Sequence, residues 1–238
     1  MIISDLLRSG SKILKNCKVQ SHLLDSEIML SSLLKKKKEQ IIINSEKKVP
    51  RSTINDFNKL IIRRSKKEPL AYILKKKEFW SKSFFVNRNT LIPRPETELL
   101  CDMVIKKIKD KKPFILDLGT GTGCILLSIL SENKKAKGLG IDISKKAIEV
   151  AKKNSYSHGL NKRAVFLTRS LDKINNYKFD LIVSNPPYIK TSDIKNLSDD
   201  VRKFEPKIAL DGGKDGLDVI KKVIYKSKTI LKKLGLLA

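Results

Sequence analysis

The tetrapeptide Asn185-Pro186-Pro187-Tyr188 contains the residue types that point most directly to a reaction. Proline has no N–H group, so carbonyl groups in this segment can face a ligand without a competing donor. A primary amide or an exocyclic amine offers two N–H groups, which the Asn185 side-chain oxygen and the Pro186 carbonyl could both accept. Tyr188 could pack on the planar group. The pattern predicts a site that orients a planar nitrogen; a polyproline turn after a strand is the alternative.

The chemistry that suits such a site is methyl transfer onto that nitrogen. An amide nitrogen is a poor nucleophile because its lone pair is delocalised. Hydrogen bonds accepted from both of its N–H groups increase electron density on the nitrogen as it pyramidalises. This gain is larger in the transition state than in the ground state. Alignment with a methyl carbon supplies much of the rest, so no strong general base is needed.

A glycine-rich run, Gly119-Thr120-Gly121-Thr122-Gly123, ends 62 residues before Asn185 and follows an apolar segment. Glycines permit a tight turn and close approach of a ligand. The spacing differs from the G-x-G-x-x-G of dinucleotide sites, and Asp117 before it suits a cationic group better than a phosphate. Asp142 lies where an acid grips ribose hydroxyls. We therefore predict S-adenosylmethionine and not NAD as the cofactor, with a plain turn as the alternative.

The elements that would position these motifs alternate from residue 114 onward. The expected strands are 114–118, 138–141, 164–167 and 179–184, and the expected helices are 124–131, 145–155 and 216–233. This alternation predicts an α/β fold with a doubly wound, Rossmann-like parallel sheet and helices on both faces. Both motifs would lie at the carboxyl ends of strands, where such sheets bind ligands.

The first part of the chain has a different character. Three apolar stripes at helical spacing predict a small N-terminal helical bundle over residues 1–74, typical of a recognition or packing module. Residues 75–93 are rich in aromatic residues and read as a β-hairpin linker. The catalytic domain would occupy residues 94–238.

Composition narrows the function classes. The net charge is +26, but 42 of the 51 basic residues are Lys, spread along the chain. Sequence-reading nucleic-acid proteins rely on Arg, so we expect a solvated surface and no specific nucleic acid partner. Three separated cysteines favour reduced thiols in the cytoplasm, and two histidines argue against a metal centre. No apolar run approaches 18 residues, so no membrane span is expected.

The motifs also resemble those of the protein-(glutamine-N5) methyltransferases that modify peptide chain release factors. The similarity covers about residues 20–238, and the Pro93–Glu98 segment is specific to that family, whereas Asn185–Tyr188 is shared with many amino-methyltransferases. The matching segments are 68–73, 78–80, 91–98, 117–123, 142–144, 184–189, 204–206 and 209–213.

The resemblance implies S-adenosylmethionine as cofactor and, as substrate, the glutamine in the Gly-Gly-Gln loop of a release factor, which the N-terminal helices would help to dock. The implied cofactor residues are Asp117, Gly119, Thr120, Gly121, Thr122, Gly123, Asp142, Ser170 and Asn185. The implied catalytic and substrate residues are Asn185, Pro186, Pro187 and Tyr188, with Arg94 and Glu98 closing the site.

Three features depart from the family pattern. Members of that family usually have glycine near the positions of Lys75 and Ser81. They usually have an acidic residue followed by an aromatic one where this chain has Arg169-Ser170-Leu171. The segment Leu234–Ala238 reads as the opening of a fifth strand, after which family members continue with an antiparallel pair. We therefore expect the C-terminal strands to be missing and one sheet edge to be open.

Two other functions remain open at this point. An N6-adenine or N4-cytosine methyltransferase acting on RNA or DNA would explain the charge and Asn185–Tyr188 equally well. It would not explain Pro93–Glu98 or the helical N-terminal region. An inactive truncated remnant that binds a partner through its N-terminal bundle is the non-enzymatic alternative.

Overall fold

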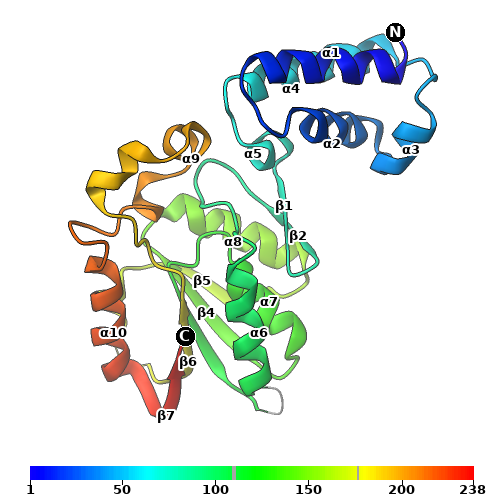
Figure 1. Ribbon diagram of the computed structural model, residues 1–238. Helices are drawn as coiled ribbons and strands as arrows, with labels where there is room; N and C mark the ends of the chain where they lie inside the picture. Colours follow the sequence, from blue (N-terminus) through cyan, green and yellow to red (C-terminus); the bar gives the residue numbers. More distant parts are fainter. Residues whose placement is uncertain (109–110, 176) are drawn as a thin grey trace. The chain divides into compact units, whose positions relative to one another are not determined.

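The computed structural model describes residues 1–108, 111–175 and 177–238, which form two compact units, Met1–Leu74 and Lys75–Ala238 (Figure 1). Each unit has a hydrophobic core of its own. No helix within the described ranges is long and apolar enough to cross a membrane.

Residues 1–74, all of which the structure describes, fold into helices. The long ones, α1 (Ile3–Asn16), α2 (His22–Leu34) and α4 (Arg51–Ser65), surround a core that includes Leu14, Met29 and Phe57. Two short helices, α3 (Lys38–Ile43) and α5 (Leu70–Leu74), were not expected, because five or six residues are too few to show helical periodicity.

The second unit begins with a β-hairpin of β1 (Lys76–Phe79) and β2 (Lys82–Phe85). Its two-residue turn, Trp80-Ser81, has a φ of 52° at both positions. Left-handed backbone at both turn residues is the geometry that matches the twist of the paired strands. The turn thereby directs Phe79 and Phe84 into the core of this unit, where both are buried.

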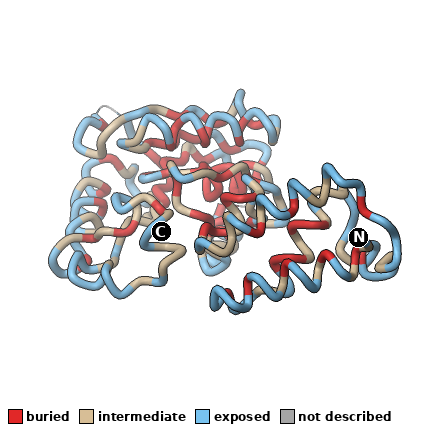
Figure 2. Tube along the Cα trace, turned by 90° about the horizontal axis from the view of Figure 1, so that it is seen from above, coloured by how far each residue is buried: buried red, intermediate tan, exposed pale blue. Residues whose placement is uncertain are grey.

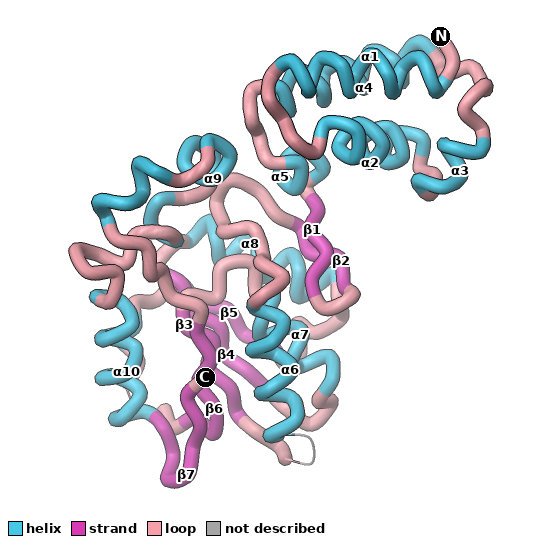
Figure 3. Tube along the Cα trace, viewed as in Figure 1, coloured by secondary structure: helices cyan, strands magenta, loops and turns pink. Residues whose placement is uncertain are grey.

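A five-stranded parallel sheet forms the centre of this unit and confirms the predicted fold class (Figure 3). Its order is β5-β4-β3-β6-β7. The strands are β3 (Phe114–Leu118), β4 (Lys137–Asp142), β5 (Ala164–Thr168), β6 (Phe179–Ser184) and β7 (Leu231–Leu237). The chain crosses from β5 to β6 over β4 and β3, so β3 and β6 meet where the winding direction changes. Such a switch point opens a crevice at the strands' carboxyl ends.

Alternating side chains of the strands cover two faces of the sheet. Ile115 and Leu181 face a core shared with α6 (Thr97–Ile108), α7 (Cys124–Glu132) and α8 (Lys145–Ser157). Leu116 and Ile182 face the opposite core, shared with α10 (Asp218–Ile230). Figure 1 shows α10 across the sheet from α6 and α7. Figure 2 shows buried residues in red in each of the two units. Burial on both faces explains the almost continuous apolar runs of the strands.

The segment between β6 and α10 contains α9 (Asp199–Phe204) and two short 3₁₀ segments, Thr191–Asn196 and Lys207–Ala209. A further short 3₁₀ segment, Leu171–Lys173, lies between β5 and β6. The helix expected over 216–233 ends at Ile230, because Leu231–Leu237 instead pairs with β6 as an edge strand. Backbone bonds of Ala238 with Ile182 and Ser184 extend this pairing.

Candidate active site

A cavity of about 690 Å³ lies at the carboxyl ends of β3, β4 and β6. This volume falls within the range of small-molecule sites. Six residues expected to bind the cofactor or the substrate are part of its lining: Gly119, Gly121, Asp142, Asn185, Pro186 and Pro187. The sheet therefore brings both sequence motifs to one cavity.

The glycine-rich loop turns between β3 and α7 with left-handed backbone at each of its three glycines. The φ values are 69° at Gly119, 53° at Gly121 and 79° at Gly123, a region that other residues enter at a cost. A Cβ atom on Gly119 would meet nothing within 4 Å, so this position opens toward the cavity, whereas one on Gly123 would approach Phe166 at 3.1 Å. Gly119 and Gly121 line the cavity, and Gly123 permits close packing behind it.

The threonines of the loop face the protein instead of the cavity. Thr120 and Thr122 are both buried. The Thr120 backbone N–H donates to the Ile141 carbonyl at 2.9 Å, and the Thr122 carbonyl accepts from the Asn154 side chain at 2.9 Å. These contacts attach the loop to β4 and α8. In the structure, both threonines therefore hold the loop in position. Their contact with the cofactor stays a prediction.

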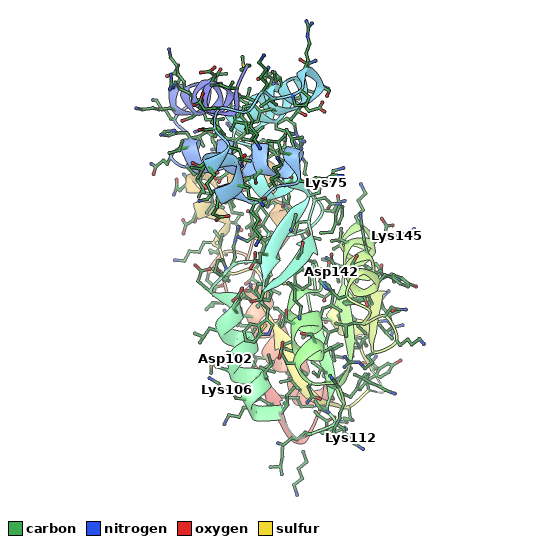
Figure 4. All side chains as sticks on the ribbon, turned by 90° about the vertical axis from the view of Figure 1, so that its right-hand side faces the viewer. Lys75, Asp102, Lys106, Lys112, Asp142 and Lys145 are labelled. Atoms are coloured by element: carbon green, nitrogen blue, oxygen red, sulfur yellow. The ribbon has the colours of Figure 1, made fainter. Side chains whose placement is uncertain are left out.

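Asp142 ends β4 at the wall of the cavity (Figure 4). One carboxylate oxygen accepts from the Gly121 N–H at 3.0 Å and the other from the Ser144 N–H at 2.9 Å. Burial raises the pKa of Asp142, while these backbone donors oppose the shift. Each oxygen has a further lone pair, so the fixed carboxylate can also accept hydrogen bonds from hydroxyl groups of a ligand.

Asp117 lies beneath the loop, fully buried at the end of β3. Its Oδ2 accepts from the Thr120 hydroxyl at 2.6 Å, while its Oδ1 has no hydrogen-bond partner among the described residues. Burial raises the pKa of this carboxyl to about 7, against the opposing effect of the Thr120 hydroxyl. Asp117 does not line the cavity, and its predicted contact with a cationic group stays a prediction.

Asn185 follows β6 directly and presents its side chain to the cavity. Its Nδ2 donates to the Thr97 hydroxyl oxygen at 3.3 Å, which directs the amide nitrogen toward the start of α6. The neighbouring Ser184 hydroxyl donates to the Leu118 carbonyl at 2.9 Å, fixing the end of β6 against β3. The predicted role of the Asn185 amide oxygen as the acceptor for a substrate N–H stays a prediction.

Pro186 and Pro187 continue the cavity wall, whereas Tyr188 does not line it and its residue is 64% exposed. The backbone beyond it is well anchored, because the Ile189 N–H donates to the Leu210 carbonyl at 3.1 Å. An exposed ring beside the cavity is available to an incoming chain. The packing of Tyr188 on a substrate stays a prediction.

Arg94 and Glu98 contact other protein segments. Arg94 Nη2 donates to Glu205 Oε1 at 2.6 Å, and Glu98 Oε1 accepts from the Trp80 N–H at 2.8 Å. Neither side chain belongs to the cavity lining. Their contact with the substrate stays a prediction. In the structure, they hold Pro93–Glu98 against the hairpin turn and against the segment that follows α9.

Ser170 is also outside the lining, but its neighbours Arg169 and Leu171 form part of it. The Arg169 N–H donates to the Asp142 carbonyl at 2.9 Å, so this loop follows the wall begun by β4. The departure from the family pattern at 169–171 therefore lies on the cavity itself. A contact of Ser170 with the cofactor stays a prediction.

Sequence reasoning missed several residues that shape the site. Asn89, Thr90 and Leu91 line the cavity from the segment after the hairpin, and Thr97 and Glu205 hold residues of the site. Thr97 and Glu205 fall within segments that carry the family resemblance, so a signal existed. Nothing in the sequence marked their long-range partners.

Comparison with family models finds two matches on this chain. A model described as "Methyltransferase small domain" matches residues 95–201, and one described as "PrmC N-terminal domain" matches residues 5–74. The first match includes the glycine-rich loop and the Asn185–Tyr188 motif.

Comparison with curated proteins finds relatives called release factor glutamine methyltransferase. The protein of Caulobacter vibrioides is 39% identical over 94% of this chain and 78% of its own length. That of Clostridium acetobutylicum is 38% identical over 100% of this chain and 85% of its own length. That of Buchnera aphidicola subsp. Baizongia pistaciae is 40% identical, with 97% and 83% covered.

Proposed function

Because the chain belongs to the release factor glutamine methyltransferase family, we propose that it methylates the glutamine of the Gly-Gly-Gln loop of a peptide chain release factor. The side-chain amide nitrogen would gain the methyl group that S-adenosylmethionine supplies and would release one of its two protons to water, with S-adenosylhomocysteine as the other product. The observation that carries the proposal is the placement of Asn185 beside the glycine loop in one cavity. The reaction would take place in the cytoplasm, where release factors act on ribosomes.

The cavity residues fit S-adenosylmethionine. Gly119 leaves open space above the loop, and Asp142 presents a carboxylate held by two backbone N–H groups. Gly119 and Gly121 would approach the cofactor closely through their backbone, and Asp142 would accept hydrogen bonds from its ribose hydroxyls. When bound, S-adenosylmethionine supplies a methyl group activated by its sulfonium charge.

The substrate amide would be held by Asn185 and Pro186, which both line the cavity. The Asn185 Oδ1 and the Pro186 carbonyl accept the two N–H groups of the glutamine side chain. Accepting these protons supports the increase in charge density at nitrogen during attack, which is where stabilisation accelerates a reaction. The exposed Tyr188 would pack on the planar amide.

The N-terminal unit, Met1–Leu74, would contribute by docking the release factor. Its described surface carries several exposed apolar side chains, including Leu23, Ile43 and Ile62. Isolated exposed apolar residues are normal, but a helical bundle with its own core offers a stable surface for a protein partner. Such a second point of attachment would help to deliver a single loop glutamine to the cavity.

The experiment that tests this function is methyl transfer to purified release factor, read by mass spectrometry of the Gly-Gly-Gln peptide. Asn185→Ala should lower the rate on the order of 10²–10³-fold, as loss of a transition-state hydrogen bond does. Binding of S-adenosylmethionine, measured by calorimetry, should be largely unchanged, because Asn185 acts on the substrate amide. Full activity of Asn185→Ala would refute the mechanism.

Two control substrates separate the alternatives. A release factor whose loop glutamine is replaced by glutamate should accept no methyl group. Random RNA and DNA oligonucleotides should also remain unmethylated. Methylation of adenine or cytosine with an unmodified release factor would instead support the nucleic-acid methyltransferase.

A further inference from the structure

The hydrogen bond between Asn185 and Thr97 joins residues that lie 88 positions apart in the chain. Thr97 begins α6, and Asn185 follows β6, so the contact connects the start of a helix with the catalytic edge of the sheet. Thr97 does not itself line the cavity, whereas Asn185 does. A role for Thr97 would therefore act through Asn185.

The two ends of an asparagine side chain have nearly the same shape and opposite hydrogen-bonding character. The oxygen only accepts and the NH₂ group only donates. The terminal torsion has two broad, roughly equivalent orientations, so an unrestrained amide can present either end to a ligand. If the NH₂ group of Asn185 faced the cavity, it would meet the N–H groups of a glutamine amide and oppose its binding in the reactive orientation.

Thr97 is well placed to hold the Asn185 side chain because its own position is fixed, and in the structure its hydroxyl oxygen accepts from Nδ2. A hydroxyl can also donate to an amide oxygen, so it favours this orientation when its own proton is directed away from Asn185. The Thr97 backbone N–H donates to the Arg94 carbonyl at 3.1 Å. Arg94 forms an ion pair with Glu205. Glu98, the residue after Thr97, accepts a hydrogen bond from the Trp80 N–H. A β-branched side chain also has few rotamers. The hydroxyl is thus carried on a segment anchored on both sides.

We propose that Thr97 is a positioning residue that holds the Asn185 amide in the observed orientation, with Nδ2 on the Thr97 hydroxyl and Oδ1 left for the substrate. The inference rests on the proposed function, in which Oδ1 accepts a proton of the glutamine amide. The Nδ2 to Oγ1 distance of 3.3 Å is that of a long, neutral hydrogen bond, so the expected contribution is moderate. Losing it should lower kcat roughly 3- to 10-fold.

The test compares Thr97→Val, which keeps the branched shape without the hydroxyl, with Thr97→Ser, which keeps the hydroxyl. Thr97→Val should reduce kcat for release factor methylation, while the Kd for S-adenosylmethionine and the Tm stay near the wild-type values. Thr97→Ser should restore most of kcat. Equal rates in wild type and Thr97→Val would overturn the proposal, as would equal losses in both variants.

A double-mutant cycle shows whether the effect passes through Asn185. In an Asn185→Ala background there is no amide to orient, so Thr97→Val should cause no additional loss in single-turnover rate. An undiminished additional loss would contradict the proposal. Full activity of Asn185→Ala would refute the proposed chemistry. An inactive Asn185→Ala together with a normal Thr97→Val would refute only the role of Thr97.

Discussion

Asp117 has an unusual environment for a carboxyl group at neutral pH, because it is fully buried and one of its oxygens lacks a partner among the described residues. Burial raises its pKa from 3.8 to about 7. Since the folded state then binds its proton more tightly than the unfolded state, this group lowers stability as the pH rises from about 4 to 7. The lost stability stays constant above pH 7, where both states are ionised.

We predict that Asp117→Asn stabilises the protein without cofactor at pH 8. The neutral amide does not have to ionise in a buried place, and a shift of this size corresponds to a free energy of on the order of 4 kcal/mol. Urea unfolding of variant and wild type from pH 4 to pH 8 measures the difference in the free energy of unfolding. That difference should grow up to about pH 7 and then level off. A difference independent of pH would contradict the assignment.

Asp142 provides a second prediction at the residue scale. Asp142→Ala removes a carboxylate that would accept hydrogen bonds from both ribose hydroxyls, each worth roughly 1.5–3 kcal/mol. The Kd for S-adenosylmethionine should therefore rise at least tenfold in calorimetry. Asp102→Ala is the matched control, because Asp102 lies on α6 and pairs with Lys106 at the surface (Figure 4). Equal affinity in Asp142→Ala and wild type would show that the acid does not hold the cofactor.

The segment Pro93–Glu98 connects several elements of the second unit. It reaches Glu205 through Arg94, Asn185 through Thr97 and the hairpin turn through Glu98. The Glu205 side chain is only 1% exposed and also accepts from the Ile92 N–H at 3.0 Å, whereas the Arg94 side chain is 34% exposed. The two partners of this ion pair therefore differ strongly in access to water.

This asymmetry predicts unequal costs of mutation. Arg94→Met should destabilise the protein by about 3–5 kcal/mol, because it leaves a buried carboxylate without its charge partner. Glu205→Gln should cost less, since the remaining guanidinium is partly hydrated and Gln can still accept from Ile92. The double variant should recover part of the loss of Arg94→Met in urea unfolding. Lys203→Met, which removes an exposed ion pair with Asp199, is the control and should change stability little.

The elements differ in how far the sequence could predict them. β3 and β6 were predicted residue for residue, because their apolar runs are bounded by clear turn signals. The glycine loop was equally readable, since positive φ at three alternate positions favours glycine. The end of α10 was missed: residues 231–233 continue the helical pattern, and only pairing with β6 makes them a strand.

Long-range side-chain contacts were outside the reach of sequence reasoning. Nothing local marks Thr97 as a partner of Asn185 or Glu205 as a partner of Arg94. The only sign of the unusual hairpin turn in the sequence is that Lys75 and Ser81 stand where glycine is usual. The structure places Lys75 and Ser81 in left-handed backbone, at φ values of 54° and 52°, where glycine would meet no steric penalty.

For the whole molecule, the dominant physical property is the net charge of +26, carried mostly by Lys. Lys106 on α6, Lys145 on α8 and Lys112 in the loop before β3 are exposed and are labelled in Figure 4. A dispersed positive coat attracts polyanions through counterion release and carries no sequence information.

We therefore predict weak, non-specific binding to duplex DNA or RNA that disappears as salt is raised. Fluorescence anisotropy with random duplexes at about 50 mM and about 0.3 M salt measures this directly, since counterion release makes affinity fall steeply with salt. A sequence-specific complex that persists at the higher concentration would favour the nucleic-acid methyltransferase after all. Methylation of release factor should survive the same increase in salt better than oligonucleotide binding.

The ion pair between Arg94 and Glu205 joins residues 111 positions apart, and this has a consequence for how the chain can vary during evolution. Replacing Arg94 alone leaves a buried carboxylate without its charge partner, whereas replacing Glu205 alone leaves a partly hydrated guanidinium, so selection couples the two codons and constrains Arg94 more strongly. Related chains should therefore change both positions together or keep both. A chimera that joins the first half of one family member to the second half of another inherits the two charges from different parents, and it should lose most stability where the buried acid is kept and the arginine is not.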